Sequence, residues 1–123
     1  MKNVKSISLR INDEFKKRCD DTFHRLGMNL HAGINLFLSQ MILYQRLPFD
    51  VAITDVSQKR AAHEKNITVM IKTEDEIRRQ CAQLAKKAGL NLSTLISMYL
   101  VQVVDKQAIP FQILTSELEP KKN

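Results

Sequence analysis

Ser6-Ile7-Ser8-Leu9-Arg10-Ile11 alternates polar and apolar side chains, and Thr68-Val69-Met70-Ile71-Lys72 repeats that alternation, in the same phase, 62 residues later. A period of two is the pattern of a strand that buries one face. The sequence therefore predicts two equivalent half-buried strands, one in each half of the chain.

The two strands belong to a longer internal repeat. At an offset of 62, residues 5–51 align with residues 67–113 without a gap, and twelve of the 47 pairs are identical. The identical pairs are Asp13/Asp75, Glu14/Glu76, Cys19/Cys81, Gly27/Gly89, Asn29/Asn91, Leu30/Leu92, Ile34/Ile96, Leu38/Leu100, Gln40/Gln102, Gln45/Gln107, Pro48/Pro110 and Phe49/Phe111. A repeat of fixed period indicates one supersecondary unit used twice.

Each strand is followed by a predicted amphipathic helix. The helix begins near Asn12 in the first copy and near Thr73 in the second, where Thr73-x-x-Glu76 fits a capping box. Gly27 and Gly89 occupy the position where a left-handed residue ends a helix. The predicted inward stripes are Phe15, Cys19, Phe23 and Leu26 in one copy and Ile77, Cys81, Leu84, Ala85 and Ala88 in the other.

A second helix is predicted to start near residues 31 and 93, with Ser93 as the N-cap in the second copy. Both second helices should end before Pro48 and Pro110, because the residue preceding a proline disfavours the helical region. Each copy is thus a strand and two helices.

One such unit leaves its strand unpaired and its apolar faces exposed, whereas two units solve both problems together. We therefore predict a mainly α fold with a two-stranded antiparallel β-ribbon, in which both repeats share one core as a single-chain pseudo-dimer. The predicted organisation is a first repeat at 1–51, a linker at 52–66, a second repeat at 67–113 and a short tail at 114–123. The 15-residue linker spans up to about 50 Å and permits pairing within one chain or exchange between two chains.

The charge balance favours a polyanionic partner. The net charge is +6 and the sequence pI is near 9.5, which is typical of nucleic-acid binding. No apolar run reaches the roughly 18 residues that a membrane span needs, and the N-terminus lacks a signal-peptide pattern, so we expect a cytoplasmic protein with no membrane partner.

The residues do not indicate catalysis, a metal site or a cofactor. Cys19 and Cys81 fall at the same inward position of the two copies and are interpreted as reduced core residues. His24, His31 and His63 show no ligand spacing, and the three glycines form no phosphate-binding loop. We therefore expect a protein that is not an enzyme.

The strand-helix-helix pattern, with a basic residue on the strand and Gly-x-Asn-Leu between the helices, resembles the ribbon-helix-helix DNA-binding proteins. Each copy is similar to the RelB/DinJ antitoxin family, on Arg10–Lys16, Gly27–Leu30 and Leu47–Asp50, and on Gly89–Ser93 and Ile109–Gln112. Members usually carry one unit and dimerise, and usually continue into a toxin-wrapping segment, whereas this chain carries two units followed by residues 114–123. The resemblance implies a tandem ribbon-helix-helix protein of bacterial, plasmid or phage origin that binds double-stranded DNA as an autorepressor of antitoxin type.

A two-stranded ribbon fits the major groove, where base edges are unambiguous. The face opposite the core presents the predicted base contacts, which are Ser6, Ser8, Arg10, Thr68, Met70 and Lys72. An arginine bonds guanine bidentately, a lysine does so less rigidly, and a methionine packs against a thymine methyl. Because the two strands differ, we expect the best target to depart from a perfect palindrome.

The resemblance also implies phosphate contacts at the start of the second helix, where free N–H groups and the helix dipole attract anions. The predicted phosphate contacts are Lys2 and Lys5 from the N-terminal arm, His31 in the first copy, and Ser93 and Thr94 in the second. The basic residues of the first helices, such as Lys16 and Arg78, are interpreted as a solvated helix face.

Two other functions stay open at this point. The chain is alternatively a protein-interaction module that neutralises a RelE-like toxin through its linker or tail, or an accessory DNA-processing factor of a plasmid or phage. Further copies of the chain bound side by side on DNA are a third kind of partner.

Overall fold

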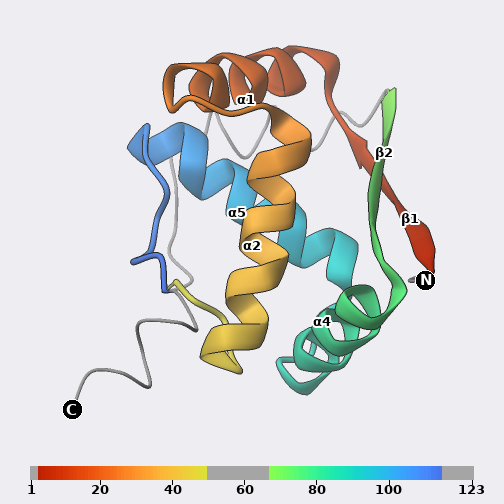
Figure 1. The fold of residues 1–123 in the computed structure, drawn as a ribbon. Coiled ribbons are helices and arrows are strands. Elements are labelled where there is room, and N and C mark those ends of the chain that lie inside the picture. The colour runs from red at the N-terminus through yellow and green to blue at the C-terminus, as the bar shows by residue number, and fades with distance from the viewer. Residues whose placement is uncertain (1–2, 50–66, 115–123) are drawn as a thin grey trace.

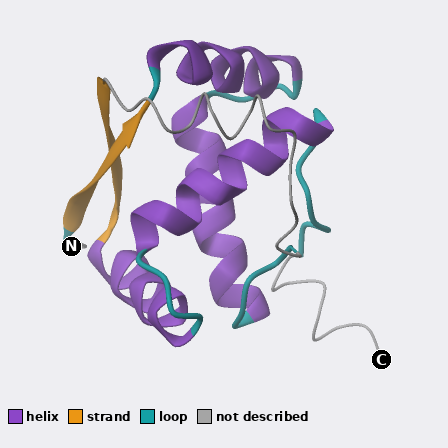
Figure 2. Cartoon of the chain, turned by 180° about the vertical axis from the view of Figure 1, so that it is seen from behind, coloured by secondary structure: helices purple, strands orange, loops and turns teal. Residues whose placement is uncertain are grey.

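The computed structural model describes residues 3–49 and 67–114, so the predicted linker 52–66 and residues 115–123 of the predicted tail lie outside the described residues. The chain forms β1 (Val4–Ile11), α1 (Asp13–Arg25), α2 (Leu30–Tyr44), β2 (Ile67–Glu74), α4 (Asp75–Lys87) and α5 (Leu92–Lys106). In Figures 1 and 2, α2 and α5 cross in the middle, α1 and α4 lie at opposite ends, and the two strands run along one side. The predicted fold class is confirmed.

The four helices in the described part of the chain follow the repeat closely. Both bounds of α4 and α5 lie 62 residues after those of α1 and α2. Gly27 and Gly89 have φ of 86° and 81°, the left-handed conformation that lets the backbone leave the first helix of each repeat without a Cβ penalty. Both second helices end well before the prolines, each on a glutamine in the left-handed region, Gln45 with φ 58° and Gln107 with φ 53°.

The strands pair antiparallel within the chain, and their register centres on the repeat. Ser8 pairs with Met70, its own counterpart at the offset of 62, while Arg10 pairs with Thr68 and Ser6 with Lys72. An approximate twofold axis therefore passes through the Ser8–Met70 pair. The two repeats form one ribbon of the kind that a symmetric dimer forms from two chains.

The same axis passes through the centre of the core. The rings of Phe37 and Tyr99, which are repeat counterparts, stack with centroids 4.3 Å apart and an interplanar angle of 7°. Phe49 lies 5.7 Å from Phe37, and Phe111 lies 6.0 Å from Tyr99, so the two (Leu/Ile)-Pro-Phe segments flank the stack. Packing these aromatic rings against each other helps to hold the two repeats together.

The repeats share one core rather than packing as separate halves. Each first helix contacts the second helix of the other repeat as well as its own, α1 against α5 and α4 against α2. One cluster of buried side chains runs through both copies, from Ile7 on β1 to Val104 on α5. Neither strand-helix-helix unit therefore encloses a core alone.

Two helix starts differ from the sequence prediction. The predicted Thr73 capping box is wrong, because β2 continues to Glu74 and α4 begins at Asp75 with no side-chain cap. Thr73 is the counterpart of Ile11, and strand alternation turns it inward, where its hydroxyl has no hydrogen-bond partner among the described residues. Thr73 therefore pairs with Lys5 in the ribbon and does not cap the helix. In the first copy Asn12 does cap, since its Oδ1 accepts from the Phe15 N–H at 3.0 Å.

The second helices start one residue before the predicted positions, at Leu30 and Leu92. Their N-caps are Asn29 and Asn91, whose Oδ1 atoms accept from the N–H groups of Ala32 at 2.7 Å and Thr94 at 2.8 Å. The prediction of Ser93 as N-cap is therefore wrong. Asparagine follows the left-handed glycine by two residues in both copies, and it reaches the third helical N–H directly.

The predicted inward stripes of the first helices are confirmed except at their last positions. Phe15, Cys19 and Phe23 are fully buried, whereas Leu26 is 36% exposed. Ala88, the counterpart of Leu26, is also exposed. Both residues follow the last helical residue, as C-caps, so they have turned away from the core face.

At one place in the core, the two repeats put the large side chain on different helices. Phe23 is fully buried, and a Cβ built on Gly33 would lie 2.3 Å from its ring. The counterparts of Phe23 and Gly33 in the second repeat are Ala85 and Leu95, both fully buried. In the first repeat a large residue on α1 faces a glycine on α2, and in the second a small residue on α4 goes with a leucine on α5.

The cysteines are buried and reduced, as predicted. Burial is the main cause that raises the pKa of each thiol, Cys19 and Cys81, from 9.0 to about 12. Thiolate is the reactive form, so we expect labelling of the native protein by a thiol reagent to be slowed about a thousandfold. Both thiols should react at once when the chain is unfolded in urea. Rapid labelling of folded protein would contradict this.

The same burial makes stability depend on alkaline pH. Because the folded thiols have the higher pKa, their contribution is complete below the ordinary value of 9.0 and is lost as pH rises from 9 toward about 12. We expect the urea midpoint to fall over that window more steeply for the native chain than for Cys19→Ala/Cys81→Ala.

Candidate nucleic-acid interface

All six side chains predicted to contact bases lie on the outward face of the ribbon. Ile7, Leu9, Ile11 and Ile71 are buried beneath it, and Val69 is half-buried. The alternate residues are exposed: Ser6, Ser8, Arg10, Thr68, Met70 and Lys72. A strand period of two therefore separates a core face from a solvent face along both strands. This outward face is called the ribbon face below.

The register arranges the ribbon face in three rows. Ser8 and Met70 form the central row on the axis. Arg10 with Thr68 form the row nearer α1, since β1 runs directly into α1 after Ile11. Ser6 with Lys72 form the row nearer α4. Each outer row thus carries one basic side chain beside one hydroxyl.

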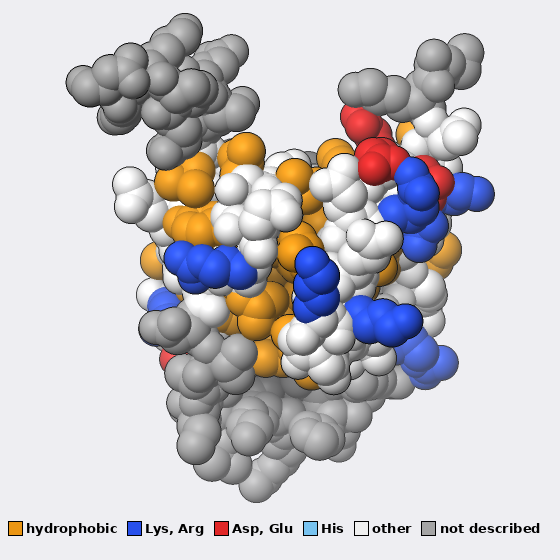
Figure 3. Space-filling view, turned by 90° about the horizontal axis from the view of Figure 1, so that it is seen from below, with side chains coloured by type: hydrophobic (Ala, Val, Ile, Leu, Met, Phe, Trp, Pro, Cys, Tyr) orange, Lys and Arg blue, Asp and Glu red, His pale blue; other side chains and the backbone are white. Residues whose placement is uncertain are grey.

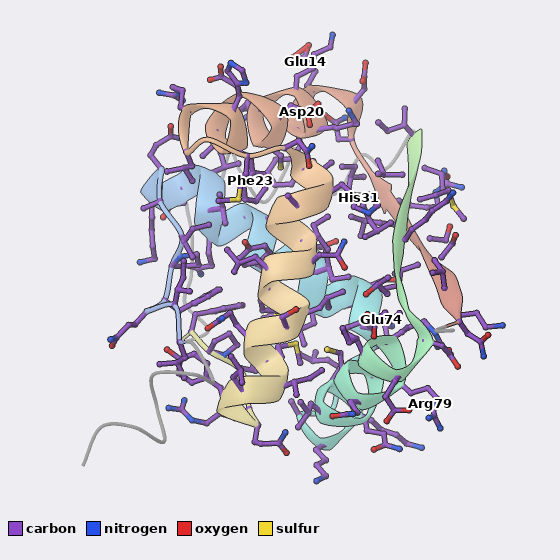
Figure 4. The ribbon with its side chains drawn as sticks, in the orientation of Figure 1. Glu14, Asp20, Phe23, His31, Glu74 and Arg79 are labelled. Carbon is purple, nitrogen blue, oxygen red and sulfur yellow. The ribbon has the colours of Figure 1, made fainter. Side chains whose placement is uncertain are left out.

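Side chains from the second helices hold the ribbon against the body. His31 Nε2 lies 3.0 Å from the carbonyl oxygen of Lys72, and Asn35 Nδ2 donates to the same oxygen at 3.2 Å. From the other repeat, the Ser93 hydroxyl donates to the Ser8 carbonyl at 3.2 Å. Figure 4 shows His31 on the first turn of α2, on the side that faces the strands. These bonds fix the ribbon's height above the helices.

The start of each second helix lies next to the ribbon. The Thr94 N–H, predicted to contact phosphate, is bonded to the Asn91 cap. Among the described residues, nothing accepts from the N–H groups of Leu92 and Ser93. The groups left to bind an anion at this helix start are therefore the first two amides.

The N-terminal arm is only partly described. Lys2 lies outside the described residues. Lys5 is exposed, pairs with Thr73 and helps to lower the pKa of Asp75, so its ammonium lies toward the start of α4. Its predicted phosphate contact stays a prediction, as do those of His31, Ser93 and Thr94.

The charges of the first helices are largely matched by acids on the same helix. Lys16 pairs with Asp20 at 2.7 Å, and Arg78 pairs with Asp75 at 2.7 Å. The hydrogen bond from Arg78 is the main cause that lowers the pKa of the Asp75 carboxyl. In contrast, Lys72 on the ribbon face forms no ion pair with any described residue. Within residues 3–49 and 67–114, no acidic side chain therefore neutralises its charge.

Sequence reasoning missed Asn35 and the two asparagine caps. The caps carry a signal, because Asn29 and Asn91 are among the identical pairs of the repeat. Asn35 carries none, since its counterpart is Ser97 and its bond to Lys72 joins residues 37 positions apart.

The end of the described chain lies on the opposite side of the molecule from the ribbon (Figure 1). Gln40 on α2 holds the backbone of Leu114 at both ends, with its Nε2 donating to the carbonyl at 2.9 Å and its Oε1 accepting from the N–H at 2.7 Å. The Tyr44 hydroxyl donates to the Gln112 carbonyl at 2.6 Å.

Seen from below in Figure 3, hydrophobic side chains reach the surface between lysines and arginines. Leu43 and Ile113 are 39% and 49% exposed.

Over residues 3–49 and 67–114, no group of histidine, cysteine and acidic side chains has the geometry to hold a metal ion. None of the helices in those ranges has both the length and the apolar character of a membrane span.

Comparison with known families gives the chain's affiliation. The model of the RelB antitoxin family matches it twice, over residues 4–67 and 66–122, which together cover nearly the whole chain. The chain belongs to the RelB antitoxin family. The two matches start 62 residues apart, the offset of the internal repeat, so this member is a tandem relative of RelB/DinJ antitoxins with a role in a toxin–antitoxin module. No curated protein and no solved structure matches it significantly.

Proposed function

We propose that this RelB-family chain binds duplex DNA in a sequence-dependent way, with the ribbon face in the major groove, and represses transcription of its own operon. The observation that carries the proposal is the ribbon face itself, where all six outward side chains are exposed above a buried core. A two-stranded ribbon fits a groove about 12 Å wide. The net charge of +6 favours association with the phosphate backbone.

The ribbon supplies base readout, and the helix starts supply positioning. Phosphate contacts fix register but carry no sequence information, whereas base-edge contacts specify sequence. Arg10 and Lys72 would bond guanine, Met70 would contact a thymine methyl, and the amides of Leu92 and Ser93 would hold a phosphate. The His31, Asn35 and Ser93 bonds to strand carbonyls keep readout and positioning elements in one rigid arrangement.

Binding to labelled duplex tests the proposal. Fluorescence anisotropy is measured across a salt series on random DNA and on DNA upstream of the chain's own gene. We expect a steep loss of affinity with salt and one preferred site. Arg10→Ala should weaken that site roughly 10- to 100-fold, the value of one bidentate base contact. Lys17→Ala removes an equal charge from the exposed face of α1 and is the matched control, expected to change affinity little.

No retention of any duplex at low salt would overturn the DNA-binding proposal. Equal losses in Arg10→Ala and Lys17→Ala would reduce it to non-specific charge attraction. An accessory DNA-processing role would share the same contacts and would differ by leaving transcription from the operon unchanged.

A second function, neutralising a RelE-like toxin, follows from the family and is favoured by the place where the described residues end. The family match extends to residue 122, beyond the last described residue. Gln40 and Tyr44 hold the backbone of residues 112–114 against α2, on the side away from the ribbon. A toxin held by the residues that follow would leave the ribbon face open, so both functions are compatible in one chain.

A further inference from the structure

We infer that this chain recognises a non-palindromic DNA site in one fixed orientation, with a strongly read guanine at the α1 end and a weakly read one at the α4 end. The inference rests on the proposed function and specifies its ligand. It follows from the register of the ribbon combined with the divergence of the two repeats. A ribbon formed by two identical chains reads both half-sites with the same residues.

The register assigns the ribbon face to two half-sites. The twofold axis passes through Ser8 and Met70, so the row of Arg10 and Thr68 faces one half-site, and the row of Lys72 and Ser6 faces the other. Each row combines residues from both strands. Exact symmetry would place an identical pair in each row, whereas Arg10 corresponds to Lys72 and Thr68 to Ser6, so the two rows differ at both positions.

The outer rows differ in the chemistry of their basic side chains. The guanidinium of arginine is a planar fork that matches the O6 and N7 atoms of guanine with two parallel hydrogen bonds. The ammonium of lysine is a point charge on a flexible stem, and it tolerates more bases and geometries. The Arg10 half-site should therefore be strict, and the Lys72 half-site should be permissive.

The two side chains of the central row, Ser8 and Met70, also differ in their chemistry. Met70 is 54% exposed on the axis, directly across from the short Ser8. Its thioether side chain offers an apolar surface to a thymine methyl, while a serine hydroxyl bonds to several bases. At the centre of a site, only one strand then carries the favoured thymine. This makes the central base pair directional too.

The polarity is built into the fold. Arg10 leads directly into α1 and Lys72 leads into α4, and these helices lie at opposite ends of the molecule (Figure 1). The Phe37–Tyr99 stack and the shared core hold both ends in one body. The protein therefore presents its two rows in a fixed order along the groove, and rotating it by a half-turn exchanges a strict contact for a permissive one.

The test begins with selection of the preferred site from random duplex using the full chain. The affinity for this site is then compared with that for two palindromes, each built by duplicating one of its half-sites. We expect the palindrome of the Lys72 half-site to bind roughly tenfold more weakly than the selected site, because it places a mismatched base under the strict Arg10 contact. The palindrome of the Arg10 half-site should lose less affinity, because Lys72 tolerates more bases.

A symmetrised variant provides the matched control. Thr68→Ser/Met70→Ser/Lys72→Arg gives both strands the outward residues Ser-Ser-Arg on the ribbon face, at exposed positions and without a change of net charge. This variant should reverse the preference and bind the palindrome of the Arg10 half-site most tightly. Replacing the central thymine by uracil removes only the methyl group, and should weaken the native chain about fourfold and the symmetrised variant not at all.

The outcomes separate the two proposals. If no duplex is bound specifically, the proposed function fails. If the native chain selects a perfect palindrome, or binds the two palindromes equally tightly, DNA recognition stands and the polarity is overturned. A preference that the symmetrised variant keeps unchanged would also overturn it, because the asymmetry would then come from elements other than the ribbon face.

Discussion

Phe23→Ala is expected to destabilise the protein by about 3–5 kcal/mol, and adding Gly33→Leu to the same chain is expected to restore a large part of that loss. Phe23 is fully buried, and its ring occupies the space that a side chain at position 33 would fill. Truncation alone leaves a cavity beside the first turn of α2, and Figure 4 shows Phe23 beneath α1 at this place. The double variant reproduces the Ala85/Leu95 combination that fills the equivalent site of the second repeat.

The effect of Gly33→Ala on the free energy of unfolding is expected to change sign between the native chain and the Phe23→Ala variant. In the native chain its Cβ would lie 2.3 Å from a ring carbon of Phe23, so we expect a loss of about 1–3 kcal/mol from overpacking. In the Phe23→Ala background the obstacle is gone, and alanine in a helix is favoured over glycine by about 1 kcal/mol. Urea unfolding of the four proteins measures the coupling directly. Additive effects would show that the two residues do not compete for one space.

The repeat alone predicted most of the fold. Alternation at residues 6–11 and 68–72 located both strands and the outward face, because a strand has only two faces. The offset of 62 also implied a twofold arrangement, and the Ser8–Met70 and Phe37–Tyr99 pairs lie on its axis. Local sequence was sufficient where one periodicity dominated.

Predictions of helix ends were weaker, because several residues competed for each end. Thr73 satisfies a capping pattern, but the strand continues through it. Ser93 is a good N-cap by type, yet Asn91 caps the helix and frees the Ser93 hydroxyl to bond the Ser8 carbonyl. In both cases a contact between distant segments outweighed a local preference, and such contacts are invisible before the fold is known.

The candidate site also has one part that the sequence predicts and another part that depends on contacts between distant segments. Exposure of the ribbon face follows from strand period, so its residues were predictable from sequence. The anchoring bonds of His31 and Asn35 to Lys72 depend on how far α2 approaches β2, which side-chain packing decides. The Phe23 and Gly33 exchange was visible as two unrelated substitutions between repeats, and only the contact between α1 and α2 shows that they compensate each other.

Lys72→Glu is expected to reduce affinity for the preferred DNA site by roughly 100-fold or more, because it removes a base contact and places a negative charge against the phosphates. Lys72 is exposed and forms no ion pair with a described residue, so the fold should keep its stability. The measurement is anisotropy at fixed salt, with urea unfolding alongside.

Lys86→Glu is the matched control, because it changes the net charge equally at an exposed position in the last turn of α4. That position lies on a helix at the end of the molecule rather than on the ribbon (Figure 1). We expect it to weaken binding only through the overall field, by a few-fold at moderate salt, where screening limits distant charges to about 10 Å. Equal losses in both variants would mean that charge, and not position on the ribbon face, governs binding. A large loss confined to Lys72→Glu would place the DNA at the ribbon, since only contact with DNA distinguishes two exposed lysines of equal charge.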